Sequence, residues 1–307
     1  MKILNDQKGI ALIIVILIIG VLVILSLQLN RSSRVAIYEA ANLSDSIQLE
    51  YVAKSGFNIA GTLLLSETGE DATLVSEWAD KERLSLRFQD LFENADCRVS
   101  IEDESGKIPL NCLTSGIGGN SEIRSVLVRF LCFPELGMNE EQASKIVDSL
   151  VECMGAHGEA ISGGESVDCI EKSSRTIKDA QESFPNGMDP KPDLCKYITF
   201  HGEGRININT APLFVLRALS PDVTEEMALK MDTFRRNRGN DLSDATWYKQ
   251  IIGMSNVTIN PQLTTTKSDT FMIVSTGVSG PMNKSIVAVV RRNPDKKSIK
   301  LLSWKVE

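Results

Sequence analysis

Histidine is scarce in this sequence, and the residue patterns of the common catalytic sites are missing from it. Only two histidines occur among the 307 residues, His157 and His201, and neither lies in the helix motif of a zinc metalloprotease. The six cysteines include no Cys-x-x-Cys pair, which disfavours a zinc site and thiol exchange. No glycine-rich segment ends in the Gly-Lys-Ser/Thr of a phosphate loop, and Gly277-Val278-Ser279-Gly280 is one residue short of a nucleophile elbow. We therefore expect a protein that is not an enzyme.

Basic residues are also fewer than acidic residues. The chain carries 33 Lys and Arg against 40 Asp and Glu, which gives a net charge of −7 and a pI near 5.1. Because proteins bind nucleic-acid phosphates with clustered Lys and Arg, this balance disfavours a nucleic-acid partner. The hydrophobic content of 42 % and the charged content of 24 % are ordinary for a folded protein, and the length allows more than one compact unit.

No charged residue occurs between Ile10 and Leu29. A helix over this segment would be about 30 Å long, which matches the hydrocarbon core of a bilayer. A cleaved secretory signal is the main alternative, but its apolar part is normally only about 7–15 residues long and ends at a small-x-small site. The residues that follow here, 30–34, show no such site. We expect a retained membrane span, with a signal sequence or a buried core helix as the other interpretations.

The charges around the apolar run do not decide its orientation. Two basic residues precede it and two follow it, namely Lys2, Lys8, Arg31 and Arg34. The more informative feature is a short polar leader that ends in Lys8-Gly9 directly before Ile10. Gly9 has a simple interpretation as a flexible joint. Its alternative interpretation is a protease site, because an unbranched residue lets the backbone enter a narrow cleft at the membrane face.

No proline occurs before Pro109, so nothing ends the first helix soon after the apolar run. Apolar residues continue at steps of three or four, at Ala36, Ala40, Leu43, Ile47 and Tyr51. We expect one helix over 10–65, half of it in lipid and half amphipathic. Its apolar residues outside the membrane need a partner, which is either the rest of this chain or neighbouring subunits.

Two strand patterns follow a mixed segment that we expect to be helical around 74–92. Apolar residues alternate with polar ones over 97–102 and again over 108–112, and Asp103-Glu104-Ser105-Gly106 fits a type I turn between them. A hairpin with a four-residue loop would place Cys97 opposite Cys112, close enough for a disulfide. A three-residue loop with a bulge would shift this register by one. An even number of cysteines fits an oxidising periplasm, and buried free thiols are the alternative.

The sequence pattern in the middle of the chain predicts a helical unit. Helical spacing covers 121–133 and 138–154, and an irregular glycine-rich stretch follows. Farther on, a strand-like start at Gly204 leads into Leu213–Leu219 and a second helix over 225–236. Asn209 or Thr210 can cap the first of these helices, and Pro212 suits its first turn. Three strands are expected at the C-terminus, at 271–278, 285–291 and 299–306.

The two short helices form a helix-hairpin-helix shape, which suggests a rival function in DNA binding. DNA-binding hairpins use a glycine-rich turn whose N–H groups approach a phosphate. Here the turn contains Pro221, which lacks a donor, and Asp222, which repels phosphate. Three arginines, Arg235, Arg236 and Arg238, form a basic cluster that we interpret as a solvated face.

The N-terminal segment resembles the type IV pilin and pseudopilin superfamily. Members have a leader that ends in glycine, a cut before the apolar helix, and a long helix packed on a C-terminal α/β domain. Counted from Ile10, the fifth residue is Ile14, where most members carry a glutamate used for register and recruitment in the fibre. The minor pseudopilin K branch of type II secretion systems lacks this glutamate.

Internal blocks strengthen the resemblance to that branch. The family's Asp-x-x-Gly-Lys-Ile-x-Leu-Asn pattern matches Asp103 to Asn111, and its Ile-Asn-x-Asn-Thr-Ala segment matches Ile206 to Ala211, before a helix over 213–219. The region 153–200 departs from the family, which commonly has an acidic run associated with calcium there. Ca²⁺ therefore stays possible without assigned ligands. Four acidic residues could supply oxygens or form only a solvated acidic stretch, namely Glu152, Glu159, Glu165 and Asp168.

The resemblance implies an α+β fold in which a long N-terminal helix packs on an antiparallel-sheet pilin-like domain with a large inserted helical domain. The expected divisions are a leader (1–9), the helix (10–65), the first part of the α/β domain (66–118), the insertion (119–205), the hairpin segment (206–262) and the closing strands (263–307).

The resemblance also implies a function and partners. The chain would cap a pseudopilus with minor pseudopilins I and J, nucleate its assembly and help export folded periplasmic proteins. A prepilin peptidase would cut between Gly9 and Ile10 and methylate the new amine. Other pseudopilins and the inner-membrane secretion platform are further partners, with the N-terminus cytoplasmic and the C-terminal domain periplasmic. A type IV pilus minor pilin and a membrane-anchored DNA receptor are the alternatives.

Overall fold

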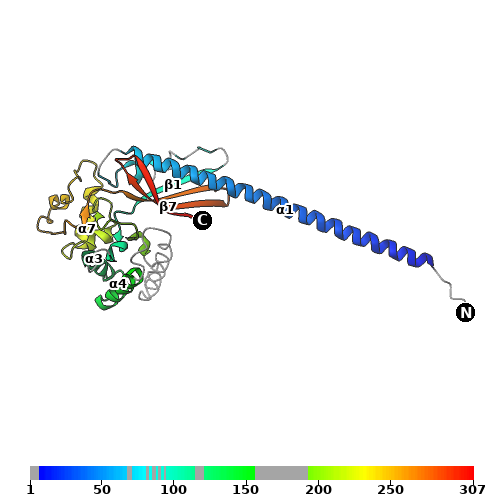
Figure 1. Ribbon diagram of the computed structural model, residues 1–307, viewed down its shortest axis with the longest axis horizontal. Coiled ribbons are helices and arrows are strands. Elements are labelled where there is room, and N and C mark those ends of the chain that lie inside the picture. Colours follow the sequence, from blue (N-terminus) through cyan, green and yellow to red (C-terminus); the bar gives the residue numbers. More distant parts are fainter. Residues whose placement is uncertain are drawn as a thin grey trace.

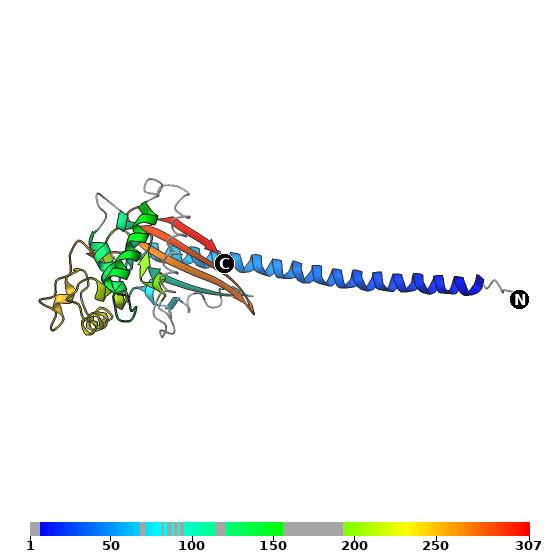
Figure 2. The ribbon, with the colours of Figure 1, turned by 90° about the horizontal axis from the view of Figure 1, so that it is seen from below.

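A computed structural model describes residues 7–67, 71–80, 83–84, 88, 91–92, 95–114, 121–155 and 193–307. Helix α1 (Gln7–Ser66) is 60 residues long, and its N-terminal part stands clear of the globular remainder in both views of the ribbon (Figures 1 and 2). The prediction of a single helix through the apolar run and beyond it is confirmed.

Burial along α1 changes at Leu49. Every large apolar side chain from Leu12 to Ile47 is exposed, whereas one face of the helix is buried from Leu49 onward. The buried side chains recur at intervals of about one helical turn, as expected for a helix with one face on a core. They are Leu49, Val52, Ala53, Ala60, Leu63 and Leu64.

That buried face lies on a four-stranded antiparallel sheet. The sheet has the order β1-β6-β7-β8, with β1 at Asp96–Asp103, β6 at Thr270–Ser279, β7 at Met282–Asn293 and β8 at Ser298–Val306. The predicted three C-terminal strands are therefore confirmed. Helix and sheet approach each other closely at two glycines: a Cβ atom at Gly56 would lie 2.3 Å from Ser275 Oγ, and one at Gly277 would lie 2.5 Å from the carbonyl oxygen of Leu49.

The predicted hairpin between 97–102 and 108–112 is wrong. Strand β1 pairs with β6, with Ile101 opposite Ile273, and the residues after the turn leave the sheet. A two-residue strand β2 (Ile108–Pro109) instead lies parallel to β3 (Ile198–Thr199), and a 3₁₀ helix η2 (Leu110–Thr114) follows. Pro109 has no N–H to donate to a ladder, which limits β2 to a short contact. The long apolar strand β6 offers β1 a full-length partner instead.

A second unit contains most of the other described helices. Helices α3 (Ser121–Leu131) and α4 (Glu140–Gly155) match the two predicted helices of the middle region. The unit also contains η3 (Leu194–Lys196), α6 (Leu213–Ala218), α7 (Glu225–Arg235) and η4 (Trp247–Gln250), together with the parallel pair β4 (Ile206–Asn207) and β5 (Thr264–Thr265). One continuous core joins Phe130, Val147, Leu216 and Trp247. The described parts of the predicted insertion and of the hairpin segment therefore share one core.

Two local predictions need correction. Neither Asn209 nor Thr210 caps α6, because Pro212 occupies the N-cap position and no side chain bonds there. The predicted helix at 74–92 lies partly outside the described residues, and the described part contains the 3₁₀ helix η1 (Glu77–Ala79). Of the three apolar residues at helical spacing in this segment, Leu84 and Phe88 are buried at 1 % exposure each, whereas Leu91 is 50 % exposed.

Candidate functional site

The N-terminal half of α1 is the most exposed apolar surface in the described part of the chain. Its large side chains are 47–70 % exposed from Leu12 to Tyr38. By length and composition it is the one described helix that could cross a membrane. Gly9 and Ile10 lie in the first turns of α1 and Ile14 is 52 % exposed, so the predicted cut would fall directly before the apolar surface. The cut itself stays a prediction.

The predicted disulfide is not present. Cys97 and Cys112 are both free and buried, because the strands that would have faced them toward each other do not pair. Cys97 Sγ lies 3.8 Å from both Ser275 Oγ and the carbonyl oxygen of Val52, beneath α1. Cys112 Sγ lies 3.6 Å from the carbonyl oxygen of Gly202. Burial raises the pKa of both thiols, which disfavours the reactive thiolate.

A buried carboxylate, Asp103, joins the two units at the end of β1. Its Oδ1 accepts a bond from the N–H of Ser105 at 2.8 Å, and its Oδ2 accepts one from Thr210 Oγ1 at 2.5 Å. Ser268 Oγ also donates to Oδ2, and Asn207 Nδ2 lies 3.4 Å from the same oxygen. Burial raises the pKa of Asp103 to about 6 despite these donors. The network therefore holds together the two sequence blocks that resemble the pseudopilin K pattern.

The loop after Asp103 is shaped for this contact. A Cβ atom at Gly106 would lie 2.7 Å from Thr210 Oγ1 and 3.0 Å from the backbone nitrogen of Ala211, so only glycine fits there. Lys107 Nζ and Glu104 Oε1 form an ion pair at 2.5 Å, with side chains 7 % and 6 % exposed. The joining role of these residues was not predicted from the sequence, although the Asp-x-x-Gly-Lys pattern contains three of them, Asp103, Gly106 and Lys107.

The basic cluster in the hairpin segment is not a uniformly solvated face, and the earlier interpretation needs correction for Arg235. This side chain is 2 % exposed and donates to the carbonyl oxygens of Ala211 at 2.6 Å and Ile208 at 3.3 Å. It also pairs with Asp232 at 2.6 Å. Arg235 therefore connects α7 to the start of α6 and is not available to a phosphate, which weakens the DNA-binding alternative.

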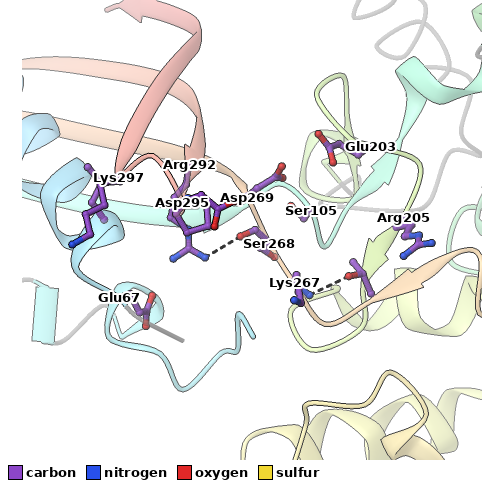
Figure 3. A pocket seen from close by; sticks show the side chains of 13 residues that line it. Glu67, Ser105, Glu203, Arg205, Lys267, Ser268, Asp269, Arg292, Asp295 and Lys297 are labelled. Carbon is purple, nitrogen blue, oxygen red and sulfur yellow. Dashed lines mark hydrogen bonds between the residues drawn. The ribbon is translucent and has the colours of Figure 1, made fainter. Parts of the chain in front are cut away.

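A cleft of about 770 Å³ lies beside the Asp103 junction, between the end of α1, the turn after β7 and the second unit (Figure 3). Arg292 is buried on its wall and donates to the carbonyl oxygens of Leu64 at 3.2 Å and Ser268 at 3.0 Å. These bonds fasten the C-terminal end of α1 to the segment before β6. The cleft carries equal numbers of basic and acidic side chains, which are Arg205, Lys267, Arg292, Lys297, Glu67, Glu203, Asp269 and Asp295.

The structure does not assign calcium ligands. Among the described residues, no group of three or more His, Cys, Asp or Glu side chains is placed to hold a metal ion. Of the four acidic candidates, Glu152 is exposed on α4, and Glu159, Glu165 and Asp168 lie outside the described residues.

Comparison with known proteins gives one kind of match. No protein-family model and no curated protein matches the chain. Among solved structures, a chain of the GspK-GspI-GspJ complex from the type 2 secretion system of enterotoxigenic Escherichia coli matches with a TM-score of 0.60 and 13 % sequence identity. The match covers 88 % of this chain and 99 % of that chain. At this low identity the likeness concerns the fold alone: the chain has an α+β, pseudopilin-like fold, as the sequence predicted.

Proposed function

We propose that this chain is a minor pseudopilin at the tip of a type II secretion pseudopilus, where it initiates and caps the fibre. The observation that carries the proposal is the division of α1 at Leu49. Below this residue the large apolar side chains have no cover within the described chain, and above it one face is fixed on the sheet. Such a helix can join a bundle of like helices through its free half.

The position of the second unit supports the capping role. It lies at the end of the molecule opposite the N-terminus of α1 (Figures 1 and 2). A subunit stacked farther along the fibre axis would meet this bulk instead of a free helix. Ile14 in place of glutamate agrees with a terminal position, because a subunit with no neighbour above it needs no charged residue to align such a neighbour.

The proposal includes the processing and the partners of the chain. A prepilin peptidase cuts between Gly9 and Ile10 and methylates the new amine, after which the helix remains in the inner membrane with residues from about 30 onward in the periplasm. Minor pseudopilins I and J, other pseudopilins and the inner-membrane secretion platform are the partners. Ca²⁺ binding is part of the proposal only as a property of the 153–200 region, without named ligands.

Intact-mass measurement of the membrane-extracted chain tests the processing step. In cells with an active prepilin peptidase we expect the mass of residues 10–307, plus one methyl group. In a peptidase deletion strain, and in a Gly9→Val variant, we expect the mass of residues 1–307. Residues 1–9 retained in peptidase-positive cells would contradict the proposal.

A type IV pilus minor pilin is the second candidate, because the same helix could join either fibre. Deletion of the gene separates the two roles. We expect loss of secreted protein from the culture supernatant with surface pili unchanged. Loss of pili with normal secretion would favour the alternative. The burial of Arg235 disfavours a membrane-anchored DNA receptor. If the chain had that role, the whole chain in native membranes would retain DNA.

A further inference from the structure

The first charged residues after the apolar run of α1 are two arginines. No charge occurs between Ile10 and Leu29, Arg31 and Arg34 follow, and the first acidic residue after the run is Glu39. Both arginines are exposed, and they belong to the part of α1 that stands clear of the globular part (Figures 1 and 2). Within the described residues neither guanidinium has an ion-pair partner. Their charge is therefore not balanced by the described part of this chain.

The side chain of Arg34 is held toward the apolar run. On a helix the Cα–Cβ bonds tilt toward the N-terminus, which here is the direction of the run. Arg34 Nε donates a hydrogen bond to Asn30 Oδ1 at 3.1 Å, one turn nearer to the run. Arg31 lies three positions before Arg34, and residues at this spacing are neighbours on a helix surface. The two arginines therefore form a pair beside the end of the run.

The spacing along α1 places this pair in the headgroup layer of a bilayer. With Leu29 at the edge of the hydrocarbon core, a rise of about 1.5 Å per residue puts Arg31 about 3 Å and Arg34 about 7.5 Å beyond that edge. The headgroup layer on each side of a bilayer is about 5–7 Å thick, and the side chains lean back toward it. Glu39 lies about 15 Å beyond the same edge. The basic groups therefore coincide with the lipid phosphates, and the first acidic group lies outside them.

The arginine pair lies on the side of α1 that packs on the sheet farther along the helix. Leu49 lies 18 positions after Arg31, and Val52 lies 18 positions after Arg34, which is about five full turns. Leu49 and Val52 are 1 % and 4 % exposed on the buried face of α1. The pair therefore faces the space between the sheet and the membrane surface.

We infer that Arg31 and Arg34 form a binding site for the phosphate of an anionic phospholipid in the outer leaflet of the inner membrane. A guanidinium binds a phosphate through two parallel N–H bonds, which fix the geometry and also pair the charges. Phosphatidylglycerol fits the pair better than phosphatidylethanolamine, because the ammonium group of phosphatidylethanolamine competes for the phosphate. The site sets the depth of α1 and opposes its withdrawal from the bilayer. This inference rests on the proposed function, which places the end of the apolar run at that leaflet, and it adds a lipid ligand and the residues that bind it.

Photo-crosslinking to lipid tests the inference with the full-length chain, reconstituted in liposomes of equal amounts of phosphatidylglycerol and phosphatidylethanolamine. The probe p-benzoylphenylalanine replaces either Val35, which is next to the pair and 49 % exposed, or Leu22, which is inside the apolar run and 59 % exposed. Mass spectrometry of the irradiated chain gives the ratio of the two lipids attached at each position. At position 22 we expect the ratio of the liposomes. At position 35 we expect an excess of phosphatidylglycerol of at least about fivefold, the effect of one basic side chain near an anionic surface.

A double substitution separates the site from the net charge of the chain. Arg31→Gln combined with Arg34→Gln should abolish the excess of phosphatidylglycerol at position 35 and leave the ratio at position 22 unchanged. Arg98→Gln combined with Arg238→Gln is the charge-matched control, because it removes two exposed arginines of the globular part, and it should keep the excess. Protease resistance of the globular part shows that both double variants still fold.

The other outcomes separate this inference from the proposed function. Equal ratios at position 35 in the wild type and in the Arg31/Arg34 double variant would overturn the inference and leave the proposed function standing. An equal loss of the excess in the charge-matched control would also overturn it, because the effect would come from net charge. Products at position 35 that join two copies of the chain in place of lipid would show a protein contact and overturn the lipid site. The absence of any lipid product at position 22 would contradict the retained membrane span, and with it the proposed function.

Discussion

At the scale of single residues, the side chains that join the two units are polar and buried. Asp103 receives its hydrogen bonds from residues far apart in the sequence, at Ser105, Thr210 and Ser268. A buried carboxylate that is held by neutral donors keeps its position only while those donors stay within hydrogen-bonding distance. The junction is therefore sensitive to the charge of one residue.

Protonation of Asp103 should leave a signature in the pH dependence of stability. Its folded-state pKa is about 6 against an ordinary value of 3.8, so between these values the folded chain binds more protons than the unfolded chain. The contribution of this group to the free energy of unfolding is present below about pH 4. As the pH rises through about 6 this contribution is lost, which lowers the free energy of unfolding by about 3 kcal/mol in total.

Thermal unfolding of the detergent-solubilised chain at pH 4 to 7 measures this effect. The melting temperature of the wild type should fall with rising pH relative to that of Asp103→Asn, which lacks the titrating group. Glu102→Gln, one residue earlier and half-buried, is the control and should follow the wild type. Parallel profiles for the wild type and Asp103→Asn would contradict the assignment.

Arg235 gives a second prediction at this scale. Arg235→Ala removes two bonds to backbone carbonyls and leaves Asp232 with only the exposed Arg236 as an ion-pair partner. Breaking a buried, bonded ion pair typically lowers the free energy of unfolding by about 3–5 kcal/mol. Arg236→Ala is the control, because Arg236 is 61 % exposed and also bonds Asp232; it should change stability by less than about 1 kcal/mol. Equal effects in denaturant unfolding would show that Arg235 has no special structural role.

At the scale of elements, the fit of α1 on the sheet depends on residues without side chains. Gly277 faces the backbone of Leu49, and a backbone atom cannot move aside as a flexible side chain can. Gly277→Ala should therefore lower the free energy of unfolding by about 1–3 kcal/mol, the usual effect of overpacking. Gly239→Ala is the control, since its nearest neighbour, Asn237 Oδ1, would lie 3.4 Å away. An unchanged melting temperature for Gly277→Ala would contradict the close packing.

Elements with a strong local pattern could be predicted from the sequence, and long-range pairings could not. The spacing in the C-terminal part of α1, in α3 and α4 and in β6 and β7 reflects one buried face for each element, so these elements could be located from local patterns. The partner of β1 is about 170 residues away in β6, and no local pattern distinguishes it from the nearer 108–112 segment. The disulfide prediction failed for the same reason.

The functional residues also differ in whether they could be predicted from the sequence. The apolar half of α1 is continuous in sequence and could be predicted from it, whereas the cut before Ile10 stays a prediction. The Asp103 network and the buried Arg235 depend on contacts across 24 to 165 residues. Asp103 and Arg235 are buried, although their charge suggests that they are exposed. The charge of Arg235 was the basis for predicting it in a solvated cluster.

At the scale of the whole molecule, the chain is a long helix with bulk at one end. The free apolar half of α1 suits lateral packing in a bundle, and the second unit occupies the opposite end (Figure 1). A subunit stacked farther along a fibre axis would meet this bulk instead of a free helix. This asymmetry supports the proposed tip position, which is the central claim.

Immunogold labelling of assembled fibres tests that claim most directly. An epitope tag inserted after Glu307 is located by electron microscopy on pseudopili sheared from cells that overproduce the major subunit. We predict gold at one end of each labelled fibre, with no fibres in cells that lack this chain and its minor partners. Gold distributed along the shafts would contradict the capping role.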